Sequence, residues 1–346
     1  MQVFEREDGW PTTAKAGWLA SEFDTAANAR AFSPRELELL TSLVEKTKEM
    51  GLAVTEITRE VFTHPELEDS FADWVRSLKF GQGLLQLKGF PVRSLPEDDI
   101  WRMYWGIGSH FGIGVSQNTN GQLQGKVTVT PGIVSGRVYG TSTMASLHSD
   151  RIDFLTLLCI NKAKSGGENV FVSTLKAWEL IEAERPDILA LLKRGYPQHR
   201  MGEEPEGCAP VTPYRVPVFG EAAGLRSCYI AGNVNIGMQQ RHFGDILTDK
   251  DVEALDYLRA VLDRPELHLR QMLEPGEAVF INNMEIGHSR AAFDDGDGPF
   301  EKRLLLRMWL QGRPIRPIPQ DMRVIHNPDG NLGILPKPMP EHAAAA

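Results

Sequence analysis

Residues 147–160 have the sequence LHSDRIDFLTLLCI, in which a histidine and an aspartate two positions apart precede an apolar run. The apolar run predicts a strand. Side chains at positions i and i+2 of an extended chain point to the same face, so His148 and Asp150 can offer an imidazole and a carboxylate to one metal ion. A lone H-x-D pair often arises by chance, so this interpretation depends on further ligands elsewhere in the chain.

A third candidate ligand lies near the end of the segment EPGEAVFINNMEIGHSRAAF, residues 274–293. This segment predicts a turn, a strand over residues 277–283, a second turn and then His288. Two histidines and one carboxylate form the facial triad, which leaves metal positions open for oxygen chemistry. The alternative is that His288 is a histidine satisfied at the surface or in the core.

The segment FEKRLLLRMWLQGR, residues 300–313, places two arginines on one face of a predicted strand. Arg303, Leu305, Arg307 and Trp309 alternate with leucines and a methionine that make the other face purely apolar. An arginine directed into a β-core is costly unless it meets an anion, and a bidentate carboxylate removes that cost. The alternative is an edge strand with both arginines in solvent.

The rest of the chain predicts a mainly β protein with helical additions. Helices are expected at residues 34–50, 67–78, 96–111, 174–185 and 248–262, and a short strand at 83–92. After Gly121, short apolar runs between Gly- and Pro-containing turns are typical of a sandwich or barrel. These runs are KVTVTPG, FLTLLCI, NVFVS, YRVPVFG, SCYIAG, EAVFINN and LLLRMWL. We expect one integrated catalytic domain, with a helical support region at 1–82, a core at 83–320 and a tail at 321–346.

Composition limits the classes of partner. The chain has 346 residues, a hydrophobic fraction of 42% and a net charge of −9. Without a basic cluster no nucleic-acid partner is expected, and no stretch approaches the ~18 apolar residues that a membrane span needs. The three scattered cysteines and the absence of a signal-like N-terminus favour a cytoplasmic protein with reduced thiols. We expect a small-molecule partner, and a homo-oligomer is compatible with the sequence.

One glycine-rich segment resembles a nucleotide-binding loop only superficially. Gly106, Gly108 and Gly112 lack the G-x-G-x-x-G spacing and follow a helical pattern rather than a strand. We therefore expect close helix packing or a turn there.

Taken in order, five motifs resemble the taurine dioxygenase-like family of non-haem Fe(II)/2-oxoglutarate-dependent dioxygenases, over about residues 83–317. They are H-S-D at 148–150, A-K-S-G-G-E-N at 163–169, P-G-E-A-V-F-I-N-N at 275–283, H-S-R-A-A-F at 288–293 and R-L-L-L-R at 303–307. The resemblance implies a double-stranded β-helix, or jelly-roll, core with iron at its mouth, supported by N-terminal and inserted helices. It also implies an enzyme that uses O2 to convert 2-oxoglutarate to succinate and CO2 while oxidising a substrate C–H bond by hydroxylation, desaturation or cyclisation.

The resemblance also assigns roles to individual residues. His148, Asp150 and His288 would bind iron at the catalytic centre, and Arg303 would pair with the far carboxylate of 2-oxoglutarate. Arg307 lies where the family often places a substrate contact or a second carboxylate contact. Asn169 stands where the family often has a threonine that touches 2-oxoglutarate, and its amide can still donate a hydrogen bond.

Substrate contacts are expected from the loop GVSQNTNG, residues 114–121, which precedes the metal-binding strand. Gln117 and Asn118 are candidates, and the alternative is an Asn/Gly-rich turn without a ligand. Tyr139, Asn282 and Asn283 are further candidates. If Arg307 is not already paired with 2-oxoglutarate or an internal aspartate, it would favour a substrate with a carboxylate, sulfonate or phosphonate. A natural-product intermediate is also a candidate substrate.

Two other hypotheses remain open at this point. One is a non-catalytic β-barrel sensor that binds a metal or an organic acid, and the other is a jelly-roll enzyme that uses another metal without 2-oxoglutarate.

Overall fold

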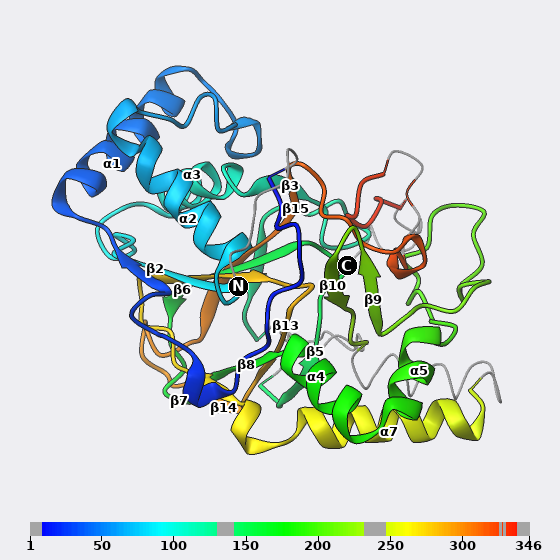
Figure 1. Cartoon of the computed structure of the whole chain (residues 1–346). Coiled ribbons are helices and arrows are strands. Elements are labelled where there is room, and N and C mark those ends of the chain that lie inside the picture. The colour runs from blue at the N-terminus through cyan, green and yellow to red at the C-terminus, as the bar shows by residue number, and fades with distance from the viewer. Residues whose placement is uncertain (1–8, 130–141, 232–246, 325–326, 328–329, 338–346) are drawn as a thin grey trace.

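The computed structural model describes residues 9–129, 142–231, 247–324, 327 and 330–337. Its centre is a pair of facing β-sheets (Figure 1). The larger sheet runs in the order β1 (Ala29–Ala31), β2 (Leu84–Lys88), β12 (Glu277–Asn282), β6 (Phe154–Asn161), β15 (Leu304–Gly312) and β3 (Gly112–Val115), and β4 (Gly125–Val127) also pairs with β15. The smaller sheet runs in the order β11 (Leu269–Gln271), β8 (Asn169–Ser173), β13 (Ile286–Arg290) and β5 (Ala145–His148).

Strand β15 shows why the sheets stack as they do. Its side chains alternate, so Leu306, Met308 and Leu310 lie in the core beneath the N-terminal helices. Leu305 and Trp309 lie in the second core, together with residues of the smaller sheet. The predicted apolar face of this strand is therefore the one covered by helices, and its arginine face is directed between the sheets.

Two groups of helices cover the outer faces. In Figure 1, α1 (Pro34–Glu49), α2 (Glu68–Phe80) and α3 (Glu97–Ser109) form the blue and cyan group against the larger sheet. The second group, α4 (Thr174–Glu184), α5 (Pro186–Arg194) and α7 (Asp249–Leu262), lies over the smaller sheet. Short 3-10 turns occur at Ala20–Glu22, Val54–Glu56, Pro65–Leu67, Pro265–Leu267 and Gln320–Met322.

The expected helices are confirmed to within a few residues. Ser33 accepts from the Glu36 amide and Glu36 accepts from the Ser33 amide, which forms a capping box at the start of α1. Thr248 caps α7 with the same reciprocal pattern. Helix α5 was not predicted, and the run YRVPVFG forms a strand only from Phe219 onward, in β9 (Phe219–Ala222), which pairs with β10 (Leu225–Cys228).

The glycine-rich segment is a packing feature, as its spacing predicted. A Cβ added at Gly106 would lie 2.3 Å from the ring of Phe62, and one at Gly108 would lie 2.8 Å from Met308. Gly106 and Gly108 lie within α3 and let it approach its neighbours closely, and Gly112 begins β3.

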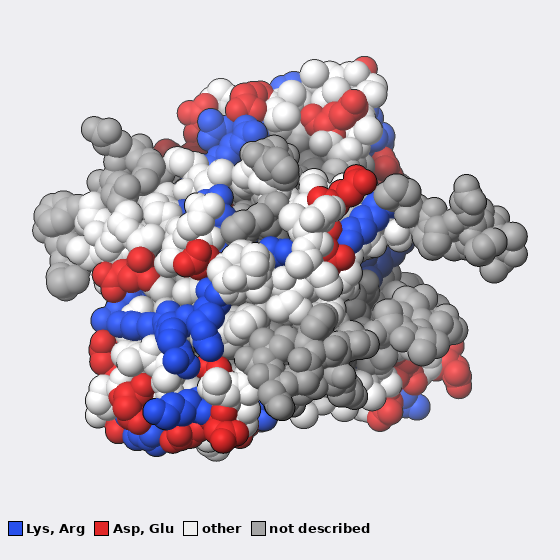
Figure 2. Space-filling model, turned by 90° about the vertical axis from the view of Figure 1, so that its right-hand side faces the viewer, with Lys and Arg blue, Asp and Glu red and all other residues white. Residues whose placement is uncertain are grey.

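Charged side chains of both signs are distributed over the face of the molecule shown in Figure 2. A group of basic side chains on that face has acidic side chains around it, so neither sign covers the face. Among the described residues, no helix combines the length and the apolar character that crossing a bilayer requires.

Candidate active site

The three candidate metal ligands converge between the sheets. His148 ends β5, Asp150 follows two residues later, and His288 lies on the adjacent strand β13 directly opposite His148. One ligand atom from each residue lies within 4.8 Å of the other two, and the imidazole centroids are 4.4 Å apart. The antiparallel pairing of β5 and β13 therefore unites ligands that lie 140 positions apart in the sequence.

Each histidine presents a nitrogen that suits a metal ion. The Nδ1 of His148 lies 2.8 Å from the carbonyl oxygen of Ser146, which favours Nδ1–H as donor and leaves Nε2 toward Asp150. The Nδ1 of His288 is buried and has no hydrogen-bond partner among the described residues. Burial lowers the pKa of His288 to about 3, so its imidazole is neutral at physiological pH, as metal ligation requires.

Asp150 is held as a carboxylate. Burial alone would raise the pKa of its carboxyl group. The positive charge of an imidazole when it is protonated, the Arg307 guanidinium and the hydrogen bond from Trp309 offset burial and hold that pKa below its usual value. Its Oδ1 lies 3.7 Å from the Nε2 of His148, and its Oδ2 accepts a 2.9 Å hydrogen bond from the indole of Trp309. Two imidazoles, one carboxylate and an unsatisfied buried nitrogen fit a divalent transition metal.

Arg303 is a buried cation with an unsatisfied donor. It precedes β15, is 5% exposed, and its NH1 has no hydrogen-bond partner among the described residues. Burial and, next, the charge of Arg290 lower the pKa of Arg303 to about 10. Asn169 and Gly167 line the same small cavity, whose other walls are mainly apolar. A buried guanidinium with a donor to spare fits a carboxylate ligand.

Arg307 lies closer to the metal ligands than Arg303 does along the same strand face. Its charge contributes to the pKa shifts of both Asp150 and His288. Its Nε donates to the side-chain oxygen of Gln117 at 2.6 Å, and the Gln117 amide donates to the Arg307 carbonyl oxygen at 3.0 Å. Gln117 is 1% exposed, so in this structure it supports Arg307.

Of the other predicted substrate contacts, the structure describes Asn118 but not Tyr139. Asn118 forms a turn, because its side-chain oxygen accepts from the amides of Asn120 and Gln122. Tyr139 lies outside the described residues. Substrate contacts by Gln117, Asn118 and Tyr139 stay predictions.

Two residues that support the centre were not singled out as such from the sequence. Asn283 accepts from the Asp150 amide at 3.2 Å and donates to the carbonyl oxygens of Asp150 and Ile152. Trp309 donates to Asp150 from the arginine face of β15. The alternation of β15 placed Trp309 on that face, but no sequence signal indicated which carboxylate it would meet.

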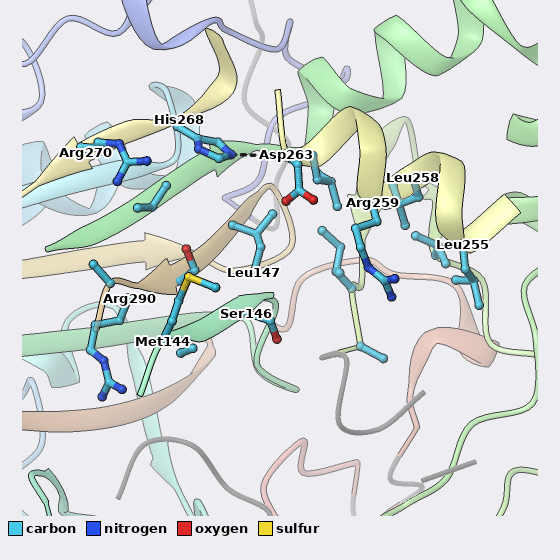
Figure 3. A pocket seen from close by; sticks show the side chains of 18 of the residues that line it. Met144, Ser146, Leu147, Leu255, Leu258, Arg259, Asp263, His268, Arg270 and Arg290 are labelled. Carbon is cyan, nitrogen blue, oxygen red and sulfur yellow. Dashed lines mark hydrogen bonds between the residues drawn. The ribbon is translucent and has the colours of Figure 1, made fainter. Parts of the chain in front are cut away.

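A separate cavity of about 260 Å³ lies on the other side of the smaller sheet, against α7 (Figure 3). Leu147, Val170 and Ser289 border it, and these residues alternate with the inward-facing His148 and His288. His268 lies at this cavity, with its Nε2 2.8 Å from the carbonyl oxygen of Leu262, and Figure 3 shows Arg290 pointing away from it. The cavity is therefore distinct from the candidate metal centre.

The fold and the centre together define a class of proteins, the double-stranded β-helix oxygenases with a two-histidine, one-carboxylate centre. The chain belongs to the family described as "Taurine catabolism dioxygenase TauD, TfdA family", whose model matches residues 47–309. FR-33289 synthase of Streptomyces rubellomurinus (strain ATCC 31215) is 27% identical over 328 residues, which cover 90% of this chain and 94% of that protein.

Solved structures with the same fold include two further oxygenases. Asparagine oxygenase in complex with Fe(II), 2S,3S-3-hydroxyasparagine and succinate has a TM-score of 0.62 and 16% identity, and the match covers 82% of this chain and 93% of that one. The non-heme iron oxygenase OrfP with Fe and alpha-ketoglutaric acid has a TM-score of 0.58 and 13% identity, with the same coverage. These similarities confirm the double-stranded β-helix fold.

The chain is therefore an Fe(II)/2-oxoglutarate-dependent oxygenase that uses O2. Family membership supports this interpretation and not the non-catalytic sensor.

Proposed function

We propose that His148, Asp150 and His288 hold the iron(II) of this oxygenase and that Arg303 receives the far carboxylate of 2-oxoglutarate. The observation that carries the proposal is the convergence of three ligand atoms within 4.8 Å of one another. The buried Arg303, which has an unsatisfied donor, supports the assignment of the co-substrate. Asn169, which lines the cavity next to Arg303, is assigned to the same co-substrate.

With iron and 2-oxoglutarate bound, O2 would be the oxidant both of 2-oxoglutarate, which gives succinate and CO2, and of the substrate C–H bond. The protein holds the reactants and excludes water. His148 is kept in one tautomer by the Ser146 carbonyl group, and Asp150 is kept ionised by its cationic surroundings. The apolar side chains between the sheets, among them Phe171 and Leu305, form a hydrophobic surface that excludes water next to the centre.

Arg307 supports a substrate that carries an acidic group. Its charge acts on both Asp150 and His288, so an anion bound to it would lie beside the metal. The solved asparagine oxygenase and OrfP complexes contain hydroxylated amino acids, which carry carboxylates. We therefore assign a small molecule with a carboxylate, sulfonate or phosphonate as the substrate, with Arg307 as its anchor.

A screen for substrate-dependent succinate tests this assignment. Amino acids, sulfonates and phosphonates are incubated with the full chain, Fe(II), 2-oxoglutarate and O2, and succinate is measured. We expect at least one acidic compound to raise succinate above the uncoupled rate, and the neutral amide or ester of that compound to fail. Equal turnover of the neutral analogue would contradict the role of Arg307.

The Gly167→Ala variant is expected to bind 2-oxoglutarate about tenfold more weakly. Gly167 has a φ of +82°, and an added Cβ would lie 3.2 Å from the Nε of Arg303. Strain of about 1–3 kcal/mol at such a position can be relieved only by shifting the turn or the arginine beside it, and about 1.4 kcal/mol is a tenfold change. Anaerobic titration of the Fe(II) protein with 2-oxoglutarate, followed by its weak visible charge-transfer band, measures the effect.

Gly207→Ala is the matched control. Gly207 has a φ of +77°, but an added Cβ would have nothing within 4 Å. It imposes similar backbone strain without touching Arg303. If the two variants bound 2-oxoglutarate equally well, the assigned co-substrate pocket would be wrong.

A further inference from the structure

The two carboxylate oxygens of Asp150 have different surroundings. Oδ1 faces the Nε2 of His148 across 3.7 Å. Oδ2 accepts a hydrogen bond of 2.9 Å from the Nε1 of Trp309, which is the shorter and better-defined contact. The tryptophan thus occupies one oxygen and leaves the other on the side of the histidines.

The backbone of Asp150 is fixed independently of this contact. Asn283 accepts from the Asp150 amide at 3.2 Å and donates to the carbonyl oxygens of Asp150 and Ile152. These bonds fix the chain but not the rotation of the carboxylate about its side-chain bonds. Among the described residues, the Trp309 indole is the hydrogen-bond donor to the carboxylate itself.

The position of Trp309 allows it to fix the orientation of the Asp150 carboxylate. It lies on β15, opposite Leu155 of β6 on one side and Val115 of β3 on the other, and it is 4% exposed. A ring anchored in a strand that is paired on both sides has little freedom to follow a moving carboxylate. The Arg307 guanidinium carbon lies 5.7 Å from its ring centroid, so the ring is close to the proposed substrate anchor as well as to Asp150.

We propose that Trp309 is a positioning residue that holds Oδ2 of Asp150 and so presents Oδ1 as a single, pre-oriented metal ligand. The proposal rests on the proposed function, in which Asp150 binds the metal. A carboxylate held in this way avoids chelating the ion through both oxygens, which keeps positions open for the co-substrate and O2. Partners of this kind typically change metal affinity by about 10- to 100-fold when they are removed.

The test compares Trp309→Phe with Trp105→Phe. Phenylalanine keeps an aromatic ring at position 309 but removes the N–H donor. Trp105 is a matched control, because its buried indole donates to the Ile57 carbonyl oxygen at 3.1 Å in the helical layer. Apo protein is titrated anaerobically with Co(II), and both the dissociation constant and the visible d–d spectrum are recorded.

We expect Trp309→Phe to raise the Co(II) dissociation constant about 10- to 100-fold and to change the spectrum. We expect Trp105→Phe to match the wild type in both measurements. Wild-type affinity and an unchanged spectrum for Trp309→Phe would overturn the inference. In that case, weakened Co(II) binding by Asp150→Asn would show that the proposed metal site still stands, whereas unchanged binding by Asp150→Asn would refute the site itself.

A measurement on the unsubstituted chain covers the case in which Trp309→Phe does not fold. The chain has seven tryptophans, whose indole N–H protons can be followed by ¹⁵N-edited NMR. When Co(II) replaces Zn(II), the resonance of an indole N–H proton that is hydrogen-bonded to a metal-bound carboxylate should shift far outside the normal indole range. The absence of any such shifted indole proton would contradict the proposal.

Discussion

The His288→Ala variant is expected to bind iron(II) more than about 100-fold more weakly and to form no substrate-dependent succinate. Removing a partner that only supports a ligand already costs about 10- to 100-fold in affinity, so removing a ligand should cost more. His288 supplies a neutral buried nitrogen opposite His148, and no other histidine among the described residues joins this group. Anaerobic Fe(II) titration and succinate release measure the two effects.

His268→Ala is the appropriate control for this prediction. His268 belongs to the cavity behind the smaller sheet, shown in Figure 3, and its Nε2 lies 2.8 Å from the Leu262 carbonyl oxygen. Its loss should cost some stability and leave metal affinity unchanged. Iron(II) binding by His288→Ala at wild-type strength would exclude the proposed triad.

Local sequence rules predicted most of the fold, and their failures have identifiable causes. The caps at Ser33 and Thr248 are reciprocal contacts within four residues, so short-range chemistry determines where those helices begin. Helix α5 was missed because a single residue, Arg185, separates the end of α4 from Pro186. A proline that ends one helix is also a favourable first residue for the next, and here it serves as both.

The run YRVPVFG shows the opposite error. Its alternating apolar residues indicate a strand, but Pro213 and Pro217 cannot donate to a ladder, and β9 begins only at Phe219. The hydrophobic pattern correctly indicated buried residues, since Val216 and Val218 are fully buried. The apolar periodicity predicted which side chains are buried, and the availability of backbone N–H donors determined which residues pair in a sheet.

The candidate site also has features that the local sequence predicted and features that it did not. His148 and Asp150 were predictable because i and i+2 share a face, and the direction of Arg303 followed from the alternation of β15. The contact between Gln117 and Arg307 joins residues 190 positions apart, and the contact of Trp309 with Asp150 depends on how β15 pairs with β6. Such contacts depend on tertiary register, which no local pattern determines.

The Arg303→Met variant is expected to lose 2-oxoglutarate affinity while keeping its metal affinity. Truncating one partner of a buried, hydrogen-bonded charge pair costs about 2–5 kcal/mol, or roughly 30-fold to a few thousand-fold in binding. Arg303→Lys should fall between Arg303→Met and the wild type, because it keeps the charge and loses the bidentate fork. The KM for 2-oxoglutarate and the Co(II) dissociation constant, measured on each variant, separate the two effects.

Arg270→Gln controls for the loss of a positive charge, because Arg270 is an exposed arginine of β11 on the outer face of the smaller sheet. It should leave the KM for 2-oxoglutarate unchanged. An Arg303→Met enzyme with an unchanged KM would refute the assigned role.

The melting temperature supplies an independent test of Arg303. Replacing a structural arginine should lower the melting temperature of the apo protein, whereas replacing a ligand-binding arginine should leave it unchanged or raise it. Without its ligand, Arg303 is a buried cation whose pKa is depressed to about 10, mainly by burial, and whose NH1 lacks a partner among the described residues. Replacing such a charge with an apolar side chain of similar length should leave the melting temperature of the apo protein unchanged or raise it. Saturating 2-oxoglutarate and metal should then stabilise the wild type more than the variant, because only the wild type gains the carboxylate contact. A lower apo melting temperature with unchanged ligand stabilisation would assign Arg303 to the fold and not to the co-substrate.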